Sequence, residues 1–443
     1  MSHRIMSRRG FLKRAMLAAP TAALLTTPLF AAQPAHTPHI LLIMADDVGY
    51  ECFGCYGSKQ YHTPRIDRMA ADGVRFTNCH STPLCTPSRL KLMTGRDNVR
   101  NYYDFGAFPK GQTTFAHLLK AQGYHTAFAG KWQLEKAFGL FPNDVGFDDV
   151  CRLIGEWPKY WKTPIALNDK ALPIDTHTYG PDRFTAFATD YIKTHKDSAK
   201  PFLFYFPMTL VHSPFEPTPE SKNPKNKKWQ QNFEDMVAHM DVCVGRILDA
   251  LEEAELSDNT VVLFTGDNGT HDSLSSTLHG QAIRGGKGYT RDHGTHVPLI
   301  VRGPGIPGGR VCEDLIDFSD FLPTMAEIAG ADLPKNTELD GRSFWPQCQG
   351  RKGNPRKWLF NYYFPRPYSQ HYDNKYRHVE TRWARDKRYK LYGDGRLFDV
   401  VDDVMEKTPL SADQAARERA FLERVLNSMP SKGASIDYDR TRL

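Results

Sequence analysis

The stretch HILLIMADDVG, residues 39–49, decides how this chain folds. Residues 39–44 are almost all apolar and carry branched side chains, a pattern typical of a strand that is buried on both faces. Such strands belong to parallel sheets that helices cover on both sides. The strand is followed directly by Asp46 and Asp47, and ligands of parallel α/β sheets bind beyond the carboxyl ends of the strands. We therefore expect a functional site just after this strand.

The chain downstream alternates between apolar runs and amphipathic stretches as far as residue 329. We predict further strands at 125–129, 201–207, 260–265 and 297–301, and helices at 64–72, 114–122, 181–195, 228–255 and 319–329. Strands that alternate with helices predict an α/β fold: a large, mostly parallel sheet sandwiched between helices.

The pattern changes after about residue 350. Short strands are predicted at 378–383, 389–392 and 397–400, joined by the turns RDK and GDG, with a last helix at 412–427. We therefore expect a main domain over residues 33–350 and a smaller antiparallel α+β subdomain over residues 351–443.

The composition of the 443 residues is ordinary for a globular protein. Hydrophobic residues make up 40% and charged residues 24%, which excludes disordered, collagenous and coiled-coil proteins. Eight cysteines are too few for a disulfide scaffold. Cys52 and Cys55 have the spacing of a redox or zinc half-site, but no second pair follows, so we interpret them as structural. No apolar run after residue 33 approaches the roughly 20 residues of a membrane helix.

The first 32 residues have the features of an export signal. Residues 7–13, SRRGFLK, form a twin-arginine motif, an Ala/Leu-rich stretch follows at 15–25, and Ala31 and Ala32 offer a cleavage point. We expect the twin-arginine translocation machinery as a partner and a periplasmic or otherwise exported protein. Removal of residues 1–32 takes away five cations and no acid, which lowers the formal charge from +6 to +1. No nucleic-acid partner is therefore expected.

A second polar cluster follows a second predicted strand. Asp267 and Asn268 come just after the strand at 260–265, as Asp46 and Asp47 come just after the first. Three carboxylates and one amide form an all-oxygen set, which suits Ca²⁺ or Mg²⁺ better than zinc. The sequence therefore predicts a metal site where these strands end.

The segment PLCTPSR, residues 83–89, places Cys85 near the start of a helix that Pro87 can open. A lone cysteine is usually a plain buried residue. The run Cys85-Thr86-Pro87-Ser88-Arg89, however, resembles the signature of the formylglycine-dependent sulfatases of the alkaline phosphatase superfamily. The resemblance extends along most of the chain after residue 33, including ADDVGY at 45–50, TGDNG at 265–269 and GGKG at 285–288.

The resemblance implies that a separate maturation enzyme oxidises Cys85 to formylglycine, whose aldehyde hydrate attacks sulfur and later expels sulfate. It implies that Asp46, Asp47, Asp267, Asn268 and the modified Cys85 bind Ca²⁺, with Mg²⁺ as an alternative. It also implies that Arg89 orients the formylglycine.

Three cations match the sulfate-binding and proton-donating residues of the family: Lys131, His212 and Lys287. Positive charge at these places would stabilise the transition state of an anionic sulfate ester. Gln133 departs from the pattern, because the family usually has a histidine there, and an amide cannot act as a base. Another histidine could substitute, sulfate release could be slow, or turnover could be lost. His271 is the nearest substitute in the sequence.

We expect a sulfuric ester hydrolase that acts on a sulfated small molecule or glycan, with a sulfated carbohydrate as the leading class. Aromatic residues at 157, 160, 161 and 179 and the segment 362–377 would either face a sugar or pack in the fold. Two alternatives stay open. A phosphate or phosphonate ester hydrolase of the same superfamily would share the site, and a protein that binds sulfated glycans without turnover would explain Gln133.

Overall fold

The structure is a computed structural model that describes residues 37–155, 159–367 and 379–433. The predicted export signal at 1–32, Trp157 and most of the segment 362–377 lie outside the described residues. Within those three ranges, no helix is both long and apolar enough to cross a bilayer.

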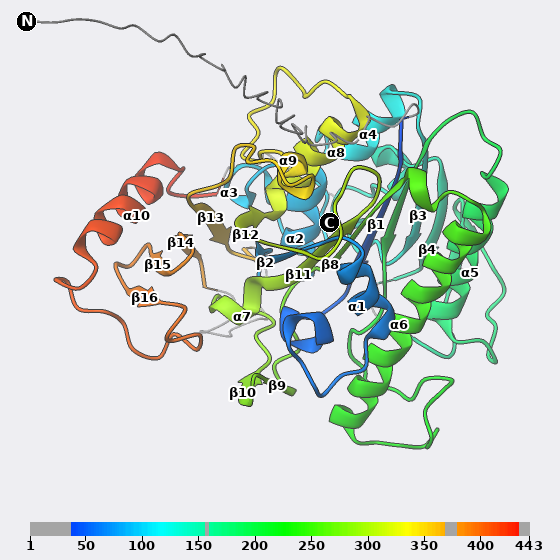
Figure 1. Cartoon of the computed structure of the whole chain (residues 1–443), viewed down its shortest axis with the longest axis horizontal. Helices are drawn as coiled ribbons and strands as arrows, with labels where there is room; N and C mark the ends of the chain where they lie inside the picture. The colour runs from blue at the N-terminus through cyan, green and yellow to red at the C-terminus, as the bar shows by residue number, and fades with distance from the viewer. Residues whose placement is uncertain (1–36, 156–158, 368–378, 434–443) are drawn as a thin grey trace, which may run out of the picture. The chain divides into compact units, whose positions relative to one another are not determined.

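The main domain is built on one ten-stranded sheet with the order β12-β2-β11-β8-β1-β7-β3-β4-β5-β6 (Figure 1). Its strands are β1 (His39–Ala45), β2 (Val74–His80), β3 (His125–Gly130), β4 (Asp149–Leu153), β5 (Ile165–Leu167), β6 (Lys170–Ala171), β7 (Phe202–Pro207), β8 (Thr260–Gly266), β11 (His296–Arg302) and β12 (Arg310–Asp317). β1 lies between β8 and β7 and runs parallel to both. β11 runs antiparallel to β2 and to β8, so β2 and β8 point the same way.

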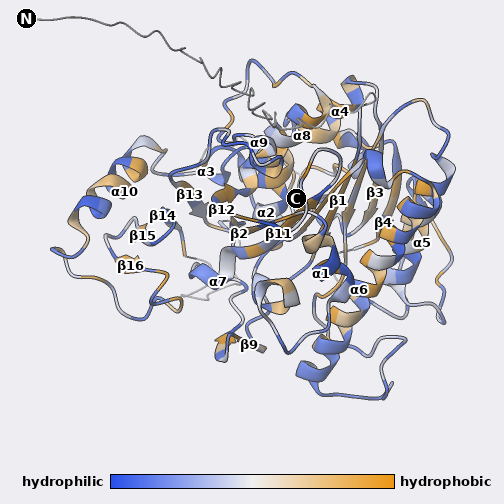
Figure 2. Cartoon of the chain, in the orientation of Figure 1, coloured by the Kyte–Doolittle hydropathy of each residue, from blue (hydrophilic) through white to orange (hydrophobic). Residues whose placement is uncertain are grey.

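Helices cover both faces of this sheet, as the first strand predicts. Leu41 and Ile43 of β1 pack into one apolar core, together with α1 (Pro64–Ala71), α5 (Gly180–Thr194) and α6 (Trp229–Glu253). Ile40, Leu42 and Met44 point to the other face. The core on that face includes α2 (Cys85–Thr94), α4 (Phe115–Ala121), α8 (Phe321–Ala329) and α9 (Trp345–Cys348). Figure 2 shows apolar strands between helices of mixed polarity.

The C-terminal part forms a separate four-stranded antiparallel sheet. It consists of β13 (Leu359–Tyr363), β14 (Thr381–Arg385), β15 (Tyr389–Tyr392) and β16 (Leu397–Asp399), with α10 (Ala416–Ser428) packed against it. Besides short 3-10 helices, the described residues also form α3 (Asn98–Asn101), α7 (Asp292–Thr295) and the strands β9 (Ser275–Leu278) and β10 (Gln281–Arg284), which pair as a hairpin. The predicted α+β character is confirmed, and the domain boundary at residue 350 stays a prediction.

Most predicted elements are present, but the structure adds short strands and helices that were not predicted: β4, β5, β6, β9, β10, β13, α3, α7 and α9. β2 and β12 were not predicted, because their apolar residues alternate with polar ones and do not form a run. The strand at 297–301 is present as β11, but it is antiparallel to its neighbours. The helix at Pro87 begins two residues earlier, so Cys85 is its first residue and does not precede it.

Candidate active site

Five strands deliver the predicted residues to one edge of the sheet. β1, β3, β7 and β8 are parallel, so their carboxyl ends share that edge, and β2 points the same way. Residues directly or shortly after these ends are Asp46 and Asp47, Cys85, Lys131, His212, and Asp267 and Asn268. β11 runs in the opposite direction, so the segment before it, which carries Lys287, also lies at this edge.

The two acids after β1 are fully buried and face different cations. Asp46 Oδ2 accepts a hydrogen bond of 2.6 Å from Lys131 Nζ. Asp47 has a left-handed backbone with φ of 60°, and its Oδ2 pairs with Lys287 Nζ. Left-handed backbone is costly for a residue other than glycine and is concentrated at functional sites. Although burial alone would raise the pKa of Asp47, Lys287 and His212 hold it well below its usual range.

Asp267 and Asn268 complete a compact oxygen cluster with the first two acids. Asp267 Oδ1 accepts from the backbone N–H of Asp47 at 3.0 Å, and Asn268 Nδ2 donates to Asp47 Oδ1 at 2.9 Å. Burial, followed by the charge of Asp46, raises the pKa of Asp267 to about 7. Carboxylates packed this closely repel one another, which a bound cation would relieve.

Two oxygens of this cluster provide a test of whether a cation fits. Asp46 Oδ1 and Asn268 Oδ1 are buried and have no hydrogen-bond partner among the described residues. Buried polar atoms without a partner are rare in folded proteins and call for a ligand, an ion or a water. Oxygen donors of this kind suit Ca²⁺ or Mg²⁺. The residues present therefore fit a hard divalent cation.

Cys85 begins α2 at the same edge and is 2% exposed. Burial raises the pKa of its thiol. Among the nearby charges, Lys131 and Lys287 lower that pKa, and Asp267 and Asp46 raise it. One turn along α2, Arg89 donates to Asp267 Oδ2 at 2.9 Å and to the carbonyl oxygen of Lys131 at 2.7 Å. Arg89 thus joins the helix that carries Cys85 to the acid cluster and to the turn after β3.

The three residues predicted to bind sulfate or donate a proton, Lys131, His212 and Lys287, lie together around Asp46 and Asp47. Lys287 Nζ is 3.0 Å from His212 Nε2, and His212 Nδ1 is 2.5 Å from the carbonyl oxygen of Ser213. A carbonyl only accepts, so Nδ1 carries the proton and Nε2 accepts from Lys287. Burial, and then the charge of Lys287, lowers the pKa of His212 to about 4, which makes the ring neutral near pH 7.

Gln133 lies two residues after Lys131 and is 6% exposed. Its backbone is left-handed, with φ of 61°, and its Oε1 is buried with no hydrogen-bond partner in the part of the chain that the structure describes. Two residues of this edge, Asp47 and Gln133, thus combine a left-handed backbone with burial. His271 belongs to another set of neighbours: its Nδ1 bonds Ser273 Oγ at 2.9 Å, and its ring packs against Phe215.

The aromatic residues at 160 and 179 are packing residues and do not face a sugar. Tyr160 and Tyr179 are each 1% exposed and stack with ring centroids 5.5 Å apart. The hydroxyl of Tyr160 lies 2.6 Å from the backbone oxygen of His212 and 2.9 Å from that of Thr209. Tyr160 therefore holds the His212 loop in place. The sequence gives no local signal for this, because the two residues are 52 positions apart.

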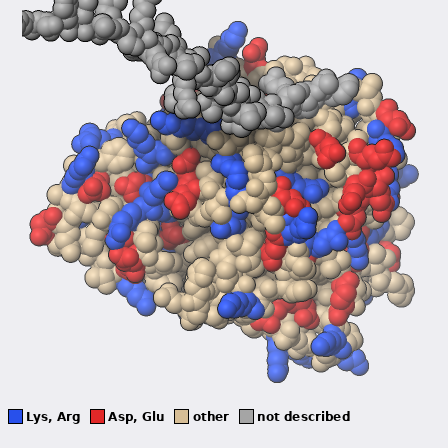
Figure 3. Space-filling model, viewed as in Figure 1, with Lys and Arg blue, Asp and Glu red and all other residues tan. Residues whose placement is uncertain are grey.

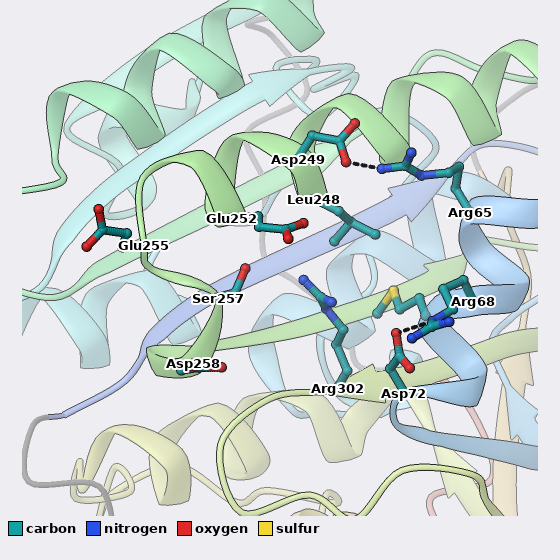
Figure 4. A pocket seen from close by; sticks show the side chains of 11 residues that line it. Arg65, Arg68, Asp72, Leu248, Asp249, Glu252, Glu255, Ser257, Asp258 and Arg302 are labelled. Atoms are coloured by element: carbon teal, nitrogen blue, oxygen red, sulfur yellow. Dashed lines mark hydrogen bonds and ion pairs between the residues drawn. The ribbon is translucent and has the colours of Figure 1, made fainter.

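A surface hollow elsewhere contains none of these residues. It has a volume of about 950 Å³ and lies between α1, α6 and the end of β11 (Figure 4). Acidic and basic side chains both line it, and Arg65 pairs with Asp249 and Arg68 with Asp72. On the face seen in Figure 3, acidic and basic side chains are likewise interspersed. The predicted site residues therefore lie at the sheet edge and not in this hollow.

Comparisons with known proteins agree with this fold. The sulfatase family model matches residues 38–331, and the model of the C-terminal part of N-sulphoglucosamine sulphohydrolase matches residues 286–429. Human arylsulfatase A is 32% identical over 366 residues, covering 74% of this chain and 71% of that protein. The solved structure of Ps i-CgsB in complex with k-i-k-neocarrahexaose is 25% identical, with a TM-score of 0.77 over 92% of this chain and 96% of the other.

A phosphonate monoester hydrolase of Agrobacterium radiobacter shares the fold, with 23% identity and a TM-score of 0.68 over 88% of this chain and 95% of that one. The fold and the site define a hydrolase of the alkaline phosphatase superfamily. Within that superfamily the chain belongs to the sulfatase family, whose members hydrolyse sulfate esters.

Proposed function

We propose that the chain hydrolyses sulfate esters with a formylglycine made from Cys85 and with a calcium ion held by the acids beside it. The observation that supports this proposal is the position of Cys85. It begins α2 at the edge where Asp46, Asp47, Asp267 and Asn268 gather, and charged residues of that cluster act on its thiol. An ordinary buried cysteine would need none of these neighbours.

Asp46, Asp47, Asp267 and Asn268 would hold the cation, together with the modified residue 85. The hydrated aldehyde of formylglycine supplies a hydroxyl nucleophile, and a divalent cation supplies positive charge that favours its ionised form. Arg89 keeps the first turn of α2 against Asp267, so residue 85 is held toward the acids.

Lys131 and Lys287 bring two positive charges to the place where a sulfate would lie. Lys131 is buried against Asp46, and Lys287 is held between Asp47 and His212. Burial alone would lower the pKa of Lys287. The charge of Asp47 more than offsets this effect, so the pKa lies above its usual value and the amine stays charged. Because His212 is neutral and accepts from Lys287, the proton nearest the substrate is carried by Lys287. We infer that this pair delivers it to the departing alcohol oxygen.

A sulfated carbohydrate is the substrate class that we propose. One solved relative binds a neocarrahexaose, and the matched C-terminal model is that of a sulphoglucosamine sulphohydrolase. Both names refer to sugars.

We further propose that a formylglycine-generating enzyme modifies the chain and that the twin-arginine machinery exports it to the periplasm. The support is the motif at residues 7–13 and the signature at residues 85–89. Fusion of residues 1–32 to a reporter that is active only after export, with Arg8 and Arg9 changed to Lys in a matched control, tests the second part.

Mass spectrometry of the peptide that contains Cys85, from protein made with a maturation enzyme, tests the central proposal. We expect formylglycine in that peptide, release of sulfate from sulfated sugars, and loss of release in Cys85→Ala. Chelation should abolish sulfate release, and added Ca²⁺ should restore it. An unmodified thiol in a protein that still turns over would contradict the mechanism.

Paired sulfate and phosphate esters of the same alcohol separate the proposal from the phosphonate and phosphate alternative. We expect the larger kcat/KM for the sulfate ester. A clear preference for the phosphate ester would indicate a phosphate or phosphonate ester hydrolase. Binding of a sulfated glycan without any release of sulfate would indicate a non-catalytic protein.

A further inference from the structure

A second cluster of metal-binding side chains lies apart from the acid cluster of the active site. His80 is the last residue of β2, Asp292 is the first of α7, and His296 is the first of β11. They are 0%, 4% and 9% exposed, respectively. One potential ligand atom from each lies within 4.8 Å of the other two. No step of the proposed mechanism uses these residues.

Hydrogen bonds fix which nitrogen of His80 carries a lone pair. Its Nδ1 is 3.2 Å from Thr295 Oγ1, and that hydroxyl donates its own hydrogen to the carbonyl oxygen of Asp292 at 3.2 Å. Thr295 therefore accepts from Nδ1–H, which leaves the lone pair on Nε2. This Nε2 is buried, and no residue in the described ranges donates to it or accepts from it. An isolated lone pair of this kind calls for a ligand.

His296 is oriented in a complementary way. Its Nε2 is 2.8 Å from the carbonyl oxygen of Thr77, so Nε2 carries the hydrogen and a neutral ring has its lone pair on Nδ1. This Nδ1 lies 3.3 Å from Asp292 Oδ2. Either a proton on Nδ1 or a metal cation between the two atoms makes this contact favourable. Two ligand atoms of a tetrahedral zinc ion, each about 2.05 Å from the metal, are about 3.4 Å apart.

Asp292 is engaged by Arg385 through one of its two carboxylate oxygens. Although burial alone would raise the pKa of Asp292, Arg385 keeps it well below its usual range. Arg385 pairs with Oδ1, so Oδ2 is left for another partner. Burial, and then the charge of Arg385, lowers the pKa of His80 well below its usual value.

We propose that His80 Nε2, His296 Nδ1 and Asp292 Oδ2 bind a divalent transition metal, with zinc as the best fit and water as the fourth ligand. Two imidazoles and one carboxylate form a set that zinc prefers and calcium does not. The metal would join the end of β2 to the start of β11, beside the backbone bond of 2.8 Å from Ser81 to Thr295.

A second group of similar residues provides a matched control. Asp182, His239 and Cys243 also place potential ligand atoms within 4.8 Å of one another. His239, however, already uses both nitrogens: Nδ1 lies 2.5 Å from Glu220 and Nε2 lies 3.1 Å from Asp182. With no lone pair left on the ring, we expect this group not to bind the metal.

Cobalt binding tests the proposal on the whole chain without an affinity tag. The protein is stripped with a chelator, saturated with Ca²⁺ and titrated with Co²⁺. We expect one equivalent to bind, with visible d–d absorption typical of four-coordinate cobalt and with no thiolate charge-transfer band, and we expect equimolar Zn²⁺ to displace it. The absence of this absorption at one equivalent in the wild-type protein would overturn the proposal.

Variants then assign the absorption to its ligands. His80→Gln and His296→Gln should each abolish the cobalt absorption, whereas His239→Gln and Cys243→Ser should retain it. Absorption that persists in the first two variants, or that is lost in the last two, would refute the assignment. Zn²⁺ added over saturating Ca²⁺ should raise the unfolding temperature of the wild type and not that of His296→Gln. Because no readout is enzymatic, these results are independent of whether Cys85 is modified.

Discussion

Gln133 combines three properties that are individually unusual for a glutamine. It is buried, its backbone is left-handed, and its side-chain oxygen has no hydrogen-bond partner among the described residues. The amide lies two residues after Lys131, so it is near the position where a sulfate would bind. It can donate and accept hydrogen bonds but cannot take up a proton near pH 7.

We expect Gln133→His to raise kcat on a sulfate ester by about tenfold or more, because an imidazole can act as a general base and an amide cannot. Histidine tolerates a left-handed backbone better than most residues, so the turn should be retained. Steady-state release of sulfate measures the effect. Gln133→Asn, which keeps the amide, is the control and should show no gain. An unchanged kcat in folded Gln133→His would mean that another group already does this work.

His39 gives the fold a defined dependence on pH. It begins β1, is 5% exposed, and its Nδ1 accepts from the backbone N–H of Phe202 at 3.0 Å. Burial, and then the charge of His195, lowers its pKa to about 4. Since the unfolded chain has the higher pKa, it binds more protons below pH 6.5, and stability falls as the pH drops from there toward 4.

The shifted pKa of His39 should therefore lower the free energy of unfolding by about 2 kcal/mol when the pH is lowered from 7 to 5. His39→Gln keeps an acceptor for Phe202 and should lose about that much of the pH dependence, as urea unfolding at the two pH values would measure. His177→Gln, at an exposed position, should follow the wild type. If the unfolding free energy changes equally with pH in His39→Gln and the wild type, other groups cause the pH dependence.

At the scale of the element, the end of β3 depends on one glycine. Gly130 has φ of 119°, and a Cβ atom there would lie 2.0 Å from the carbonyl oxygen of Pro207 in β7. That same oxygen accepts from the backbone N–H of Lys131 at 2.8 Å. A side chain at 130 would therefore separate the two strands just where Lys131 leaves the sheet.

We expect Gly130→Ala to lower the unfolding free energy by about 3 kcal/mol and to reduce activity strongly, because the strands must move apart and Lys131 moves with them. Gly139→Ala is the control. Its φ is 63° and nothing lies within 4 Å of the added Cβ, so only the backbone cost of about 1 kcal/mol applies. Chemical unfolding measures both, and equal losses would contradict the role of the Pro207 contact.

The elements also show what a sequence can predict. Continuous apolar runs such as those of β1 and β7 are recognisable, because a strand buried on both faces has no polar positions. β2 and β12 escape prediction because half of each strand is polar, and the direction of β11 depends on long-range pairing. The acids after β1 and β8 were placed from the sequence alone. The contact of Tyr160 with the His212 loop and the His80 cluster were not, since they join residues distant in the chain.

At the scale of the whole molecule, Lys91 links the main domain to the C-terminal sheet. It is fully buried in α2 and pairs with Asp97 at 2.7 Å and Asp317 at 2.8 Å. Its Nζ also donates to the backbone oxygen of Phe360 and to Asn361 Oδ1, both in β13. One ammonium group thus provides the positive charge beside two buried carboxylates and donates to the first strand of another sheet.

Lys91→Met should destabilise the protein by about 3–5 kcal/mol, because it leaves two buried carboxylates without a counter-charge. Urea unfolding measures this loss, and limited proteolysis should show earlier cleavage of the C-terminal part. Lys120→Met removes an exposed pair with Asp148 and should cost less than about 1 kcal/mol. Equal effects of the two changes would rule out the linking role of Lys91.

The near-complete burial of Cys85 has a consequence for the order of events in the cell. A modifying enzyme has almost no access to a side chain that is 2% exposed at the start of a buried helix. If Cys85 is converted as we propose, the conversion has to happen while the chain is still unfolded, in competition with its own folding. A chain that folds first would be shut off from modification, so the active fraction of a preparation should depend on the supply of the modifying enzyme during synthesis.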